Sequence, residues 1–383
     1  MTDTPNSGRL HIVLLGERNS GKSSLLNALA GQDVAIVSEV PGTTTDHVSK
    51  AMEIAGIGPC LLVDTAGLDD VGELGGKRVE GTMDALRGAD MVLVVVDGST
   101  GRMPDIPAVG VPVIPVLNKC ELVSGPGLAG AVKLKYGRTA VCASPRLGTG
   151  MAEIVSAIQE ALPEDWDAPL LTAGLVREGD LVVLVMPQDR QAPKGRLILP
   201  QQQTIRELLD RKCRVACCTT DCLAAMLASL GEKPAAIITD SQDFAAVRDL
   251  TPGGVKLTSF SMLLAAAKGD PDYFAKSAHV IDTLTASSRV LIAEACTHVP
   301  ATEDIGRVKI PRMLRARAGE GLGIDFVSGR DFPDDLTPYD LVIHCGACMF
   351  NRRYVLSRVG QAQRQNVPMT NYGFAIAYIN HII

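Results

Sequence analysis

Short apolar runs alternate with segments of helical periodicity along most of the 383-residue chain. In the first part, each apolar run is followed by Gly or Asp and then by a helical pattern. This order predicts strands of a doubly wound, mostly parallel sheet at 10–15, 60–64, 91–97 and 111–118. A stretch rich in Pro and acidic residues at 162–169 predicts a linker after this unit.

The rest of the chain repeats this alternation in two smaller α/β units. The first is expected to have strands at 181–186, 214–218 and 235–239, with helices at 201–210 and 220–230. The second is expected to have strands at 290–293 and 341–343, with helices at 305–318 and 351–365. Pro and Gly gather at 252–254 and at 268–271, and either place can be the boundary. The predicted domains are 1–165, 170–265 and 266–383.

The composition is that of an ordinary globular chain, with 46% hydrophobic and 21% charged residues. The net charge of −6 leaves no basic excess, which argues against nonspecific binding to nucleic acid or to an anionic membrane. No apolar run reaches the length of a membrane span, and the N-terminus lacks the pattern of a signal peptide. We therefore expect a cytoplasmic location, where thiols stay reduced and the ten cysteines serve as ligands or core residues.

A phosphate loop follows the first apolar run. Its sequence, Gly16-Glu17-Arg18-Asn19-Ser20-Gly21-Lys22-Ser23, has the expected spacing between a strand and a helix. The glycines let backbone N–H groups face phosphate oxygens, Lys22 neutralises phosphate charge, and the Ser23 hydroxyl ligates magnesium. The residues predicted to bind nucleotide here are Gly16, Asn19, Ser20, Gly21, Lys22, Ser23 and Ser24.

Two further segments suit the magnesium and the γ-phosphate. Asp64-Thr65-Ala66-Gly67 ends a strand, so Asp64 is predicted to reach magnesium through water and Gly67 to sense the γ-phosphate. Thr44 lies in a polar loop at 42–46 that is predicted to close over the metal, which makes Thr44 a second magnesium ligand beside Ser23.

A base-reading segment comes next. Asn118-Lys119-Cys120-Glu121 is similar to the guanine-reading Asn-Lys-x-Asp of GTPases, with Glu121 in place of Asp as the acceptor for guanine donors. Cys142-Ala143 stands where GTPases usually have Ser-Ala. Together these motifs resemble the translation-factor-related GTPases, in particular the tRNA-modification and ribosome-assembly group. The resemblance implies a P-loop GTPase that uses GTP and Mg²⁺, with catalytic residues Lys22, Thr44, Asp64 and Gly67.

Two residues bear on the rate of hydrolysis. Leu68 occupies the position where Ras-like proteins carry the glutamine that orients water, so the intrinsic rate is expected to be slow. Asn19 matches the asparagine by which potassium-activated members of this group hold K⁺, and we expect potassium to stimulate hydrolysis. The alternative for Asn19 is an amide that only stabilises the turn.

Two later segments combine thiols with imidazoles, and each follows a predicted strand. They are Cys296-Thr297-His298 and His344-Cys345-Gly346-Ala347-Cys348. Strand ends are where sites form in open α/β sheets, so a metal site is expected. Three thiolates can hold three irons of a 4Fe–4S cluster, or close a zinc site with one imidazole, and the residues alone leave both open. A second site built from Cys213, Cys217, Cys218 and Cys222 is disfavoured, because Cys217 and Cys218 lie in an apparently buried strand.

These motifs, together with the segment Ala192-Pro193-Lys194-Gly195-Arg196-Leu197-Ile198-Leu199-Pro200-Gln201, resemble the FeFe-hydrogenase maturation GTPase family (HydF) over essentially the whole chain. The resemblance implies a P-loop GTPase domain, a dimerisation domain and a cluster-binding domain, in a homodimer. It also implies a 4Fe–4S cluster on Cys296, Cys345 and Cys348. The family acts as scaffold or carrier for a diiron precursor that is made with two radical-SAM maturases and delivered to apo FeFe-hydrogenase.

The fourth ligand of such a cluster is expected to be weak and exchangeable. Asp189, which ends a predicted strand, is ranked first, because a carboxylate is a poor ligand for a soft cluster iron. His298 and His344 are the other candidates, and both could instead donate hydrogen bonds to cluster sulfur or to a carbonyl. Asp189 could also be a plain turn residue.

Two other functions are weighed against this one. A GTPase of ribosome or RNA maturation with a structural zinc is the main alternative, although the acidic charge disfavours it. A redox enzyme with an electron-transfer cluster is the third, and it lacks a flavin or substrate motif.

Overall fold

The computed structural model describes residues 5–31, 36–40, 48–65, 73–123, 127–162, 166, 170–186, 197–295 and 304–383, with the backbone alone for 36–40 and 73–78. The chain divides into two compact units, Met1–Asp167 and Ala168–Ile383, and each is described by itself.

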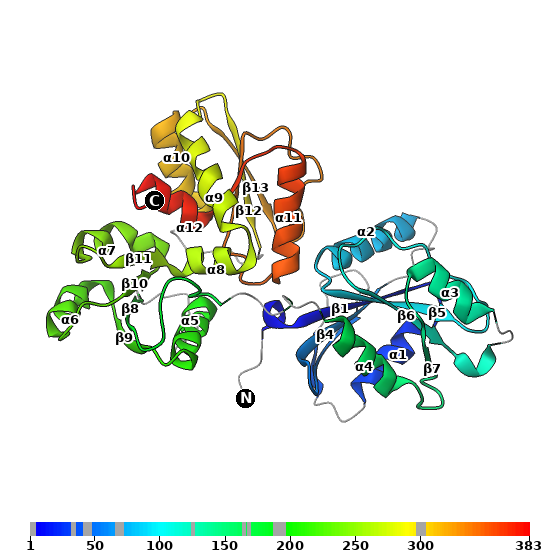
Figure 1. Ribbon diagram of the computed structural model, residues 1–383. Helices are drawn as coiled ribbons and strands as arrows, with labels where there is room; N and C mark the ends of the chain where they lie inside the picture. Colours follow the sequence, from blue (N-terminus) through cyan, green and yellow to red (C-terminus); the bar gives the residue numbers. More distant parts are fainter. Residues whose placement is uncertain are drawn as a thin grey trace. The chain divides into compact units, whose positions relative to one another are not determined.

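The first unit is a seven-stranded sheet in the order β2-β3-β4-β1-β5-β6-β7 (Figure 1). Its strands are β1 (Leu10–Gly16), β2 (Ile36–Val40), β3 (Val48–Ile54), β4 (Gly58–Asp64), β5 (Met91–Asp97), β6 (Val113–Asn118) and β7 (Val141–Ala143). Neighbours from β4 to β7 are parallel, while β3 pairs antiparallel with both β2 and β4. The predicted doubly wound sheet is confirmed, and the structure adds an antiparallel edge.

Helices cover both faces of this sheet. They are α1 (Lys22–Ala30), α2 (Glu73–Arg87), α3 (Leu128–Tyr136) and α4 (Met151–Ala161). Helices α1 and α4 share one core with Leu10, Ile12 and Leu14 of β1, whereas α2 and α3 pack with Val13 and Leu15 on the other face. Because β1 and β5 are buried on both faces, their sequences are continuous apolar runs rather than alternating ones.

The second unit contains two four-stranded, all-parallel sheets. The first has the order β11-β10-β8-β9, from β8 (Leu181–Val185), β9 (Arg214–Cys218), β10 (Ala236–Thr239) and β11 (Lys256–Ser259), with α5 (Leu199–Asp210), α6 (Leu223–Ser229), α7 (Phe244–Leu250) and α8 (Phe260–Lys268). The other has the order β13-β12-β14-β15, from β12 (Arg289–Glu294), β13 (Gly323–Ser328), β14 (Leu341–His344) and β15 (Met369–Asn371), with α9 (Pro271–Ala278), α10 (Ile310–Ala318), α11 (Arg352–Arg364) and α12 (Tyr372–Ile379).

Helix α8 contributes to the cores of both sheets. It begins at the end of β11, where the Ser259 hydroxyl accepts a hydrogen bond from the Met262 amide. Phe260 and Leu263 pack with the first sheet, and Ala265 packs with the second. Helix α12 lies so close to α8 that a Cβ on Gly373 would stand 2.4 Å from Ser261 Oγ. The predicted boundary at 265/266 falls inside α8, and the three-domain division stays a prediction.

The helix predicted over 305–318 is split in the structure. Residues Ile305–Lys309 form a π-helical turn, and α10 starts at Ile310 with Pro311 in its first turn. Proline lacks an amide hydrogen and fits only the first turn of a helix, which explains why the α-helix begins there.

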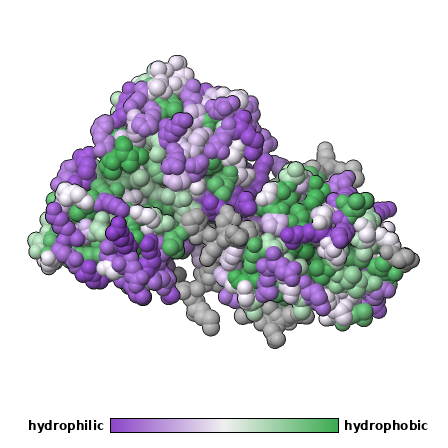
Figure 2. All heavy atoms as spheres, in the orientation of Figure 1, coloured by the Kyte–Doolittle hydropathy of each residue, from purple (hydrophilic) through white to green (hydrophobic). Residues whose placement is uncertain are grey.

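No helix within the described ranges is long and apolar enough to cross a membrane. The visible face of each unit mixes hydrophilic and hydrophobic residues (Figure 2).

Candidate functional site

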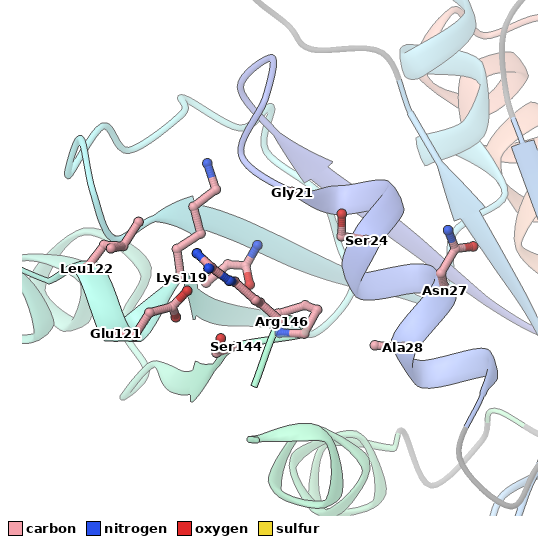
Figure 3. A pocket seen from close by; sticks show the side chains of 11 residues that line it. Gly21, Ser24, Asn27, Ala28, Lys119, Glu121, Leu122, Ser144 and Arg146 are labelled. Carbon is pink, nitrogen blue, oxygen red and sulfur yellow. The ribbon is translucent and has the colours of Figure 1, made fainter. Parts of the chain in front are cut away.

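The carboxyl ends of strands β1, β6 and β7 meet beside α1 at a cavity of about 740 Å³. The residues that line it are Gly21, Ser24, Asn27, Ala28, Asn118, Lys119, Glu121, Leu122, Ser144, Pro145 and Arg146. Lys119, Glu121, Ser144 and Arg146 lie on one side of the cavity, and Ser24, Asn27 and Ala28 of α1 lie on the other (Figure 3).

The phosphate loop joins β1 to α1 with a buried lysine at its centre. Lys22 Nζ donates to the carbonyl oxygens of Gly16 and Glu17 at 2.9 Å each, which closes the loop around the ammonium. Gly21 has φ +91°, and a Cβ there would stand 2.2 Å from Asn118 Nδ2. The loop ends at the N-terminus of α1, whose free amides and helix dipole favour phosphate.

The predicted magnesium ligands Ser23 and Asp64 are in contact. Ser23 Oγ, in the first turn of α1, donates to Asp64 Oδ2 at 2.5 Å. Thr65 Oγ1 donates to Leu14 O at 2.7 Å, which fixes the turn after β4. A hydroxyl and a carboxylate beside a phosphate loop are oxygen ligands of the type that Mg²⁺ prefers. Thr44 and Gly67, predicted for the same site, lie outside the described residues.

The base-reading segment is tied to the phosphate loop. Asn118 Nδ2 donates to Ser20 O at 2.8 Å, and Lys119 Nζ donates to Asn19 O at 2.8 Å. Lys119 Nζ also donates to Asp97 Oδ2 at 2.6 Å. Burial alone would raise the pKa of Asp97, but hydrogen bonds from Lys119 and Ser99 outweigh it, so the pKa lies below the usual value. Asp97 was not predicted as a site residue. The sequence feature that could have indicated it is its position as an acidic residue at the end of an apolar strand.

Glu121 is held as an ionised acceptor. A hydrogen bond from the Ser144 hydroxyl lowers its pKa first, and its own backbone amide and the charge of Arg146 act in the same direction. Cys142 and Ala143, which the sequence predicted here, lie in β7, and the cavity is lined two positions later by Ser144, Pro145 and Arg146.

The turn after β7 depends on one glycine. Gly150 has φ +86°, and a Cβ there would stand 2.2 Å from Cys142 O, so the turn that starts at Ser144 requires this glycine. The role predicted for Cys142 and Ala143 in base recognition stays a prediction.

The Cys345–Cys348 segment forms a turn between β14 and α11. Cys345 Sγ accepts hydrogen bonds from the amides of Ala295 at 2.9 Å and Ala347 at 3.4 Å. Ala347 has φ +51°, an uncommon value for a residue with a Cβ. Ala295, whose amide donates to Cys345 Sγ, is the last described residue before Cys296 in the sequence.

Three of the six predicted cluster ligands lie outside the described residues: Cys296, His298 and Asp189. Within the described part of the chain, no three His, Cys, Asp or Glu side chains gather in a way that could hold a metal ion. Cys345 and Cys348 lie on one turn and His344 ends the strand before it, and all six residues stay predictions as cluster ligands.

Both ring nitrogens of His344 are engaged by the protein. Nδ1 lies 2.8 Å from Cys345 O, and Nε2 lies 2.8 Å from Arg358 Nη1. Since arginine only donates, Nε2 accepts and the Nδ1 hydrogen points to the carbonyl. Burial, and then the charge of Arg358, lower the pKa of His344 to about 3, so the ring is neutral. This arrangement favours support of the turn over ligation by His344.

Two buried cations flank the cysteine turn. Lys268 Nζ donates to the carbonyl oxygens of Ala347 at 2.9 Å, Cys348 at 3.5 Å and Phe350 at 2.6 Å. Burial lowers the pKa of Lys268 to about 8, while the thiols of Cys348 and Cys345 act against that shift.

The second cation, Arg358 of α11, is enclosed by aromatic rings. Its guanidinium lies 4.5 Å from the ring centroid of Phe332, 4.7 Å from that of Phe350 and 5.1 Å from that of Tyr354. Thiols with amide donors on sulfur, beside buried positive charge, fit an anionic iron–sulfur cluster. Neither cation was predicted, because a lysine at a helix end or an arginine within a helix is ordinarily solvent-facing.

Family comparisons divide the chain into three matched segments. Residues 11–119 match the 50S ribosome-binding GTPase model. Residues 171–269 match the hydrogen maturase F dimerization domain, and residues 272–383 match its tetramerization domain. The last two segments together make up more than half of the chain and indicate an oligomeric protein.

Individual relatives match a little less than half of the chain. The tRNA modification GTPase MnmE of Burkholderia thailandensis is 37% identical over 187 residues, which are 46% of this chain and 39% of that protein. MnmE of Burkholderia orbicola is 37% identical over 194 residues, 48% of this chain and 40% of that protein. The chain thus spans about two fifths of the length of these curated relatives.

Solved structures show weaker likeness. An Era variant of Aquifex aeolicus bound to GDP.AlF4- has 23% identity and a TM-score of 0.34, over 55% of this chain and 93% of that one. The G domain of the T. maritima FeoB iron transporter has 23% identity and a TM-score of 0.31, over 40% of this chain and 99% of that one. The sheet order, the motifs and the family matches establish the GTPase fold, and on the matches at 171–269 and 272–383 the chain belongs to the hydrogen maturase F family.

Proposed function

We propose that this protein is a GTP-switched scaffold that holds a 4Fe–4S cluster, accepts a diiron precursor and delivers the diiron subcluster to apo FeFe-hydrogenase. The observation that carries the proposal is the Cys345–Cys348 turn, with the Ala295 amide on Cys345 Sγ, in a chain that also has a GTPase domain. The radical-SAM maturases that would supply the precursor, and a homodimeric assembly, belong to the same proposal.

The GTPase part of the proposal derives from the residues of the phosphate loop, the end of β4 and the cavity. Lys22 and the α1 N-terminus hold phosphates, Ser23 and Asp64 hold magnesium, and the ionised Glu121 accepts from guanine. With Leu68 in place of a water-orienting glutamine, intrinsic hydrolysis is slow, and K⁺ beside Asn19 accelerates it. Equal rates of hydrolysis in potassium and sodium salts would contradict the potassium site.

The cluster part uses Cys296, Cys345 and Cys348 as thiolate ligands. When bound, the cluster would supply an iron with an exchangeable position to which the diiron cargo can attach. Asp189 is the proposed weak fourth ligand, because the ring nitrogens of His344 are bound to Arg358 and to Cys345 O. GTP then acts through differing affinity for two states of the protein, and it regulates association with partners rather than the chemistry of the cluster.

Anaerobic reconstitution of the full chain with iron and sulfide tests the proposal. Equal amounts of iron and labile sulfide, and an EPR signal that changes with imidazole, are expected. Cys345→Ser should lose most of the iron, whereas Cys222→Ser, an exposed cysteine outside the turn, should keep it. Bound zinc without labile sulfide would contradict the proposal and favour a zinc-containing GTPase of ribosome or RNA maturation.

A further inference from the structure

Lys268 combines burial with an unusual set of partners. The side chain is 7% exposed, and its ammonium donates to three backbone carbonyls, those of Ala347, Cys348 and Phe350. Three acceptors, two at 2.9 Å and 2.6 Å and one at 3.5 Å, match the three hydrogens of a protonated lysine.

This charge has no acid partner in the described part of the chain. The ion pairs of the described residues do not include Lys268, and the groups that act electrostatically on it are the thiols of Cys348 and Cys345. Burying a cation without an anion is costly, and proteins ordinarily supply the anion. Among the described residues, the acidic groups that act on its charge are the two cysteines of the turn.

We propose that Lys268 is a positioning residue for the iron–sulfur site: it shapes the Cys345–Cys348 turn through three carbonyls, and its charge is balanced by the thiolate-bound cluster. This inference rests on the proposed cluster function. The ammonium stabilises the more negative, reduced form of a cluster more than the oxidised form, so it raises the reduction potential. It also holds the turn that carries two of the ligands, so it slows loss of iron.

The hydrogen bonds of Lys268 connect the two matched C-terminal segments of the chain. The lysine is the last residue of α8, within the segment that matches the dimerization domain, while its acceptors lie in the segment that matches the tetramerization domain. The cluster turn is therefore held by a residue from outside its own sheet.

The test compares four reconstituted full-length proteins: wild type, Lys268→Met, Lys268→Gln and Lys276→Met. Lys268→Met removes charge and donors at similar length, whereas Lys268→Gln removes charge and keeps an amide donor. Lys276→Met is the matched control, because Lys276 is an exposed lysine on the neighbouring helix α9. The readouts are an EPR-monitored dithionite titration and the rate of iron release to a chelator.

Both Lys268 variants should be harder to reduce, with an equilibrium constant for one-electron reduction about tenfold lower, which corresponds to about 59 mV. Iron release should be several-fold faster in Lys268→Met than in Lys268→Gln, and Lys276→Met should match wild type. If circular dichroism shows that Lys268→Met does not fold, the reduction potential of the cluster in Lys268→Gln alone tests the role of Lys268.

A wild-type potential in Lys268→Gln, or an equal shift in Lys276→Met, would overturn the role of Lys268. Wild-type protein that takes up no iron and sulfide would instead overturn the proposed function itself, so the two failures are distinguishable.

Discussion

At the scale of single residues, Gly21 shows how tightly the phosphate loop fits against the base-reading strand. A Cβ there would lie 2.2 Å from Asn118 Nδ2, and φ is +91°. Gly21→Ala must therefore displace Asn118 or strain the loop by about 1–3 kcal/mol. We expect GTP affinity to fall by about tenfold or more in a titration with a fluorescent GTP analogue.

The control for this substitution is Gly130→Ala in α3. A Cβ at Gly130 meets nothing within 4 Å, so GTP affinity should equal that of wild type. If both alanine variants bind GTP equally well, the close approach of the loop to Asn118 does not contribute to GTP affinity.

The buried thiol of Cys60 gives a pH dependence with a defined sign. Burial first, and then the charge of Glu53, raise the pKa of Cys60 from 9.0 to about 12. As pH rises above 9, the unfolded chain loses this proton while the folded chain keeps it. The stabilising contribution is thus complete below pH 9, and the free energy of unfolding falls by up to about 1.4 kcal/mol per pH unit above it.

Urea unfolding of wild type and Cys60→Ala between pH 7 and pH 10 measures this contribution. The difference in unfolding free energy between the two proteins should be constant below pH 8 and should change above pH 9 in the direction that disfavours wild type. A difference that is the same at every pH would refute the linkage.

Residues within one motif could be predicted from sequence, and residues defined by a neighbouring strand could not. The spacing of the phosphate loop predicted Lys22, whose hydrogen bonds to the carbonyl oxygens of Gly16 and Glu17 stay within the same loop. Asp97 contacts Lys119, and Arg146 lines the cavity, because β5 and β7 are the sheet neighbours of β6, which ends at Asn118. Lys268 contacts Cys348, which lies 80 positions later in the sequence, and no local sequence pattern predicts such a contact.

At the scale of elements, one buried arginine joins α11 to the end of β14, just before the cysteine turn. Arg358 donates to His344 Nε2 and to Gly329 O, and its guanidinium lies over three aromatic rings. Arg358→Met leaves both acceptors unsatisfied, so we expect a loss of about 2–4 kcal/mol in the free energy of unfolding of the apoprotein. Urea denaturation monitored by circular dichroism measures it.

Arg364→Met, at the exposed end of the same helix, is the matched control and should change stability by less than about 0.5 kcal/mol. Equal stability of the two variants would mean that the buried arginine does not hold the helix to the turn.

The strands that the sequence analysis did not predict lie mostly at sheet edges. Interior strands such as β1, β5 and β12 are continuous apolar runs and were predicted. The edge strands β2, β7, β11, β13 and β15 were not, and neither was β3 beside the β2 edge. An edge strand need not be apolar on both faces, so its sequence lacks the run that marks a buried strand, and pairing with its neighbour decides its conformation.

At the scale of the whole molecule, the order of α/β units could be predicted because each unit repeats one local alternation. The predicted fold class, a P-loop GTPase sheet followed by smaller α/β sheets, is confirmed. The helix that joins the later sheets could not be assigned in this way. Helix α8 carries an ordinary apolar pattern, and its position between two cores depends on Gly373 of α12, more than a hundred residues away.

The end of α8 has a practical consequence for anyone who divides this chain. The two matched C-terminal segments suggest a cut between 269 and 272. A recombinant piece started at that cut would contain Cys345 and Cys348 but would lack Lys268. If Lys268 has the proposed role, the iron content of this piece would be lower than that of the intact chain, and the low value would be mistaken for weak cysteine ligands. A piece that begins before Ser259 keeps the helix, its cap and the ammonium together.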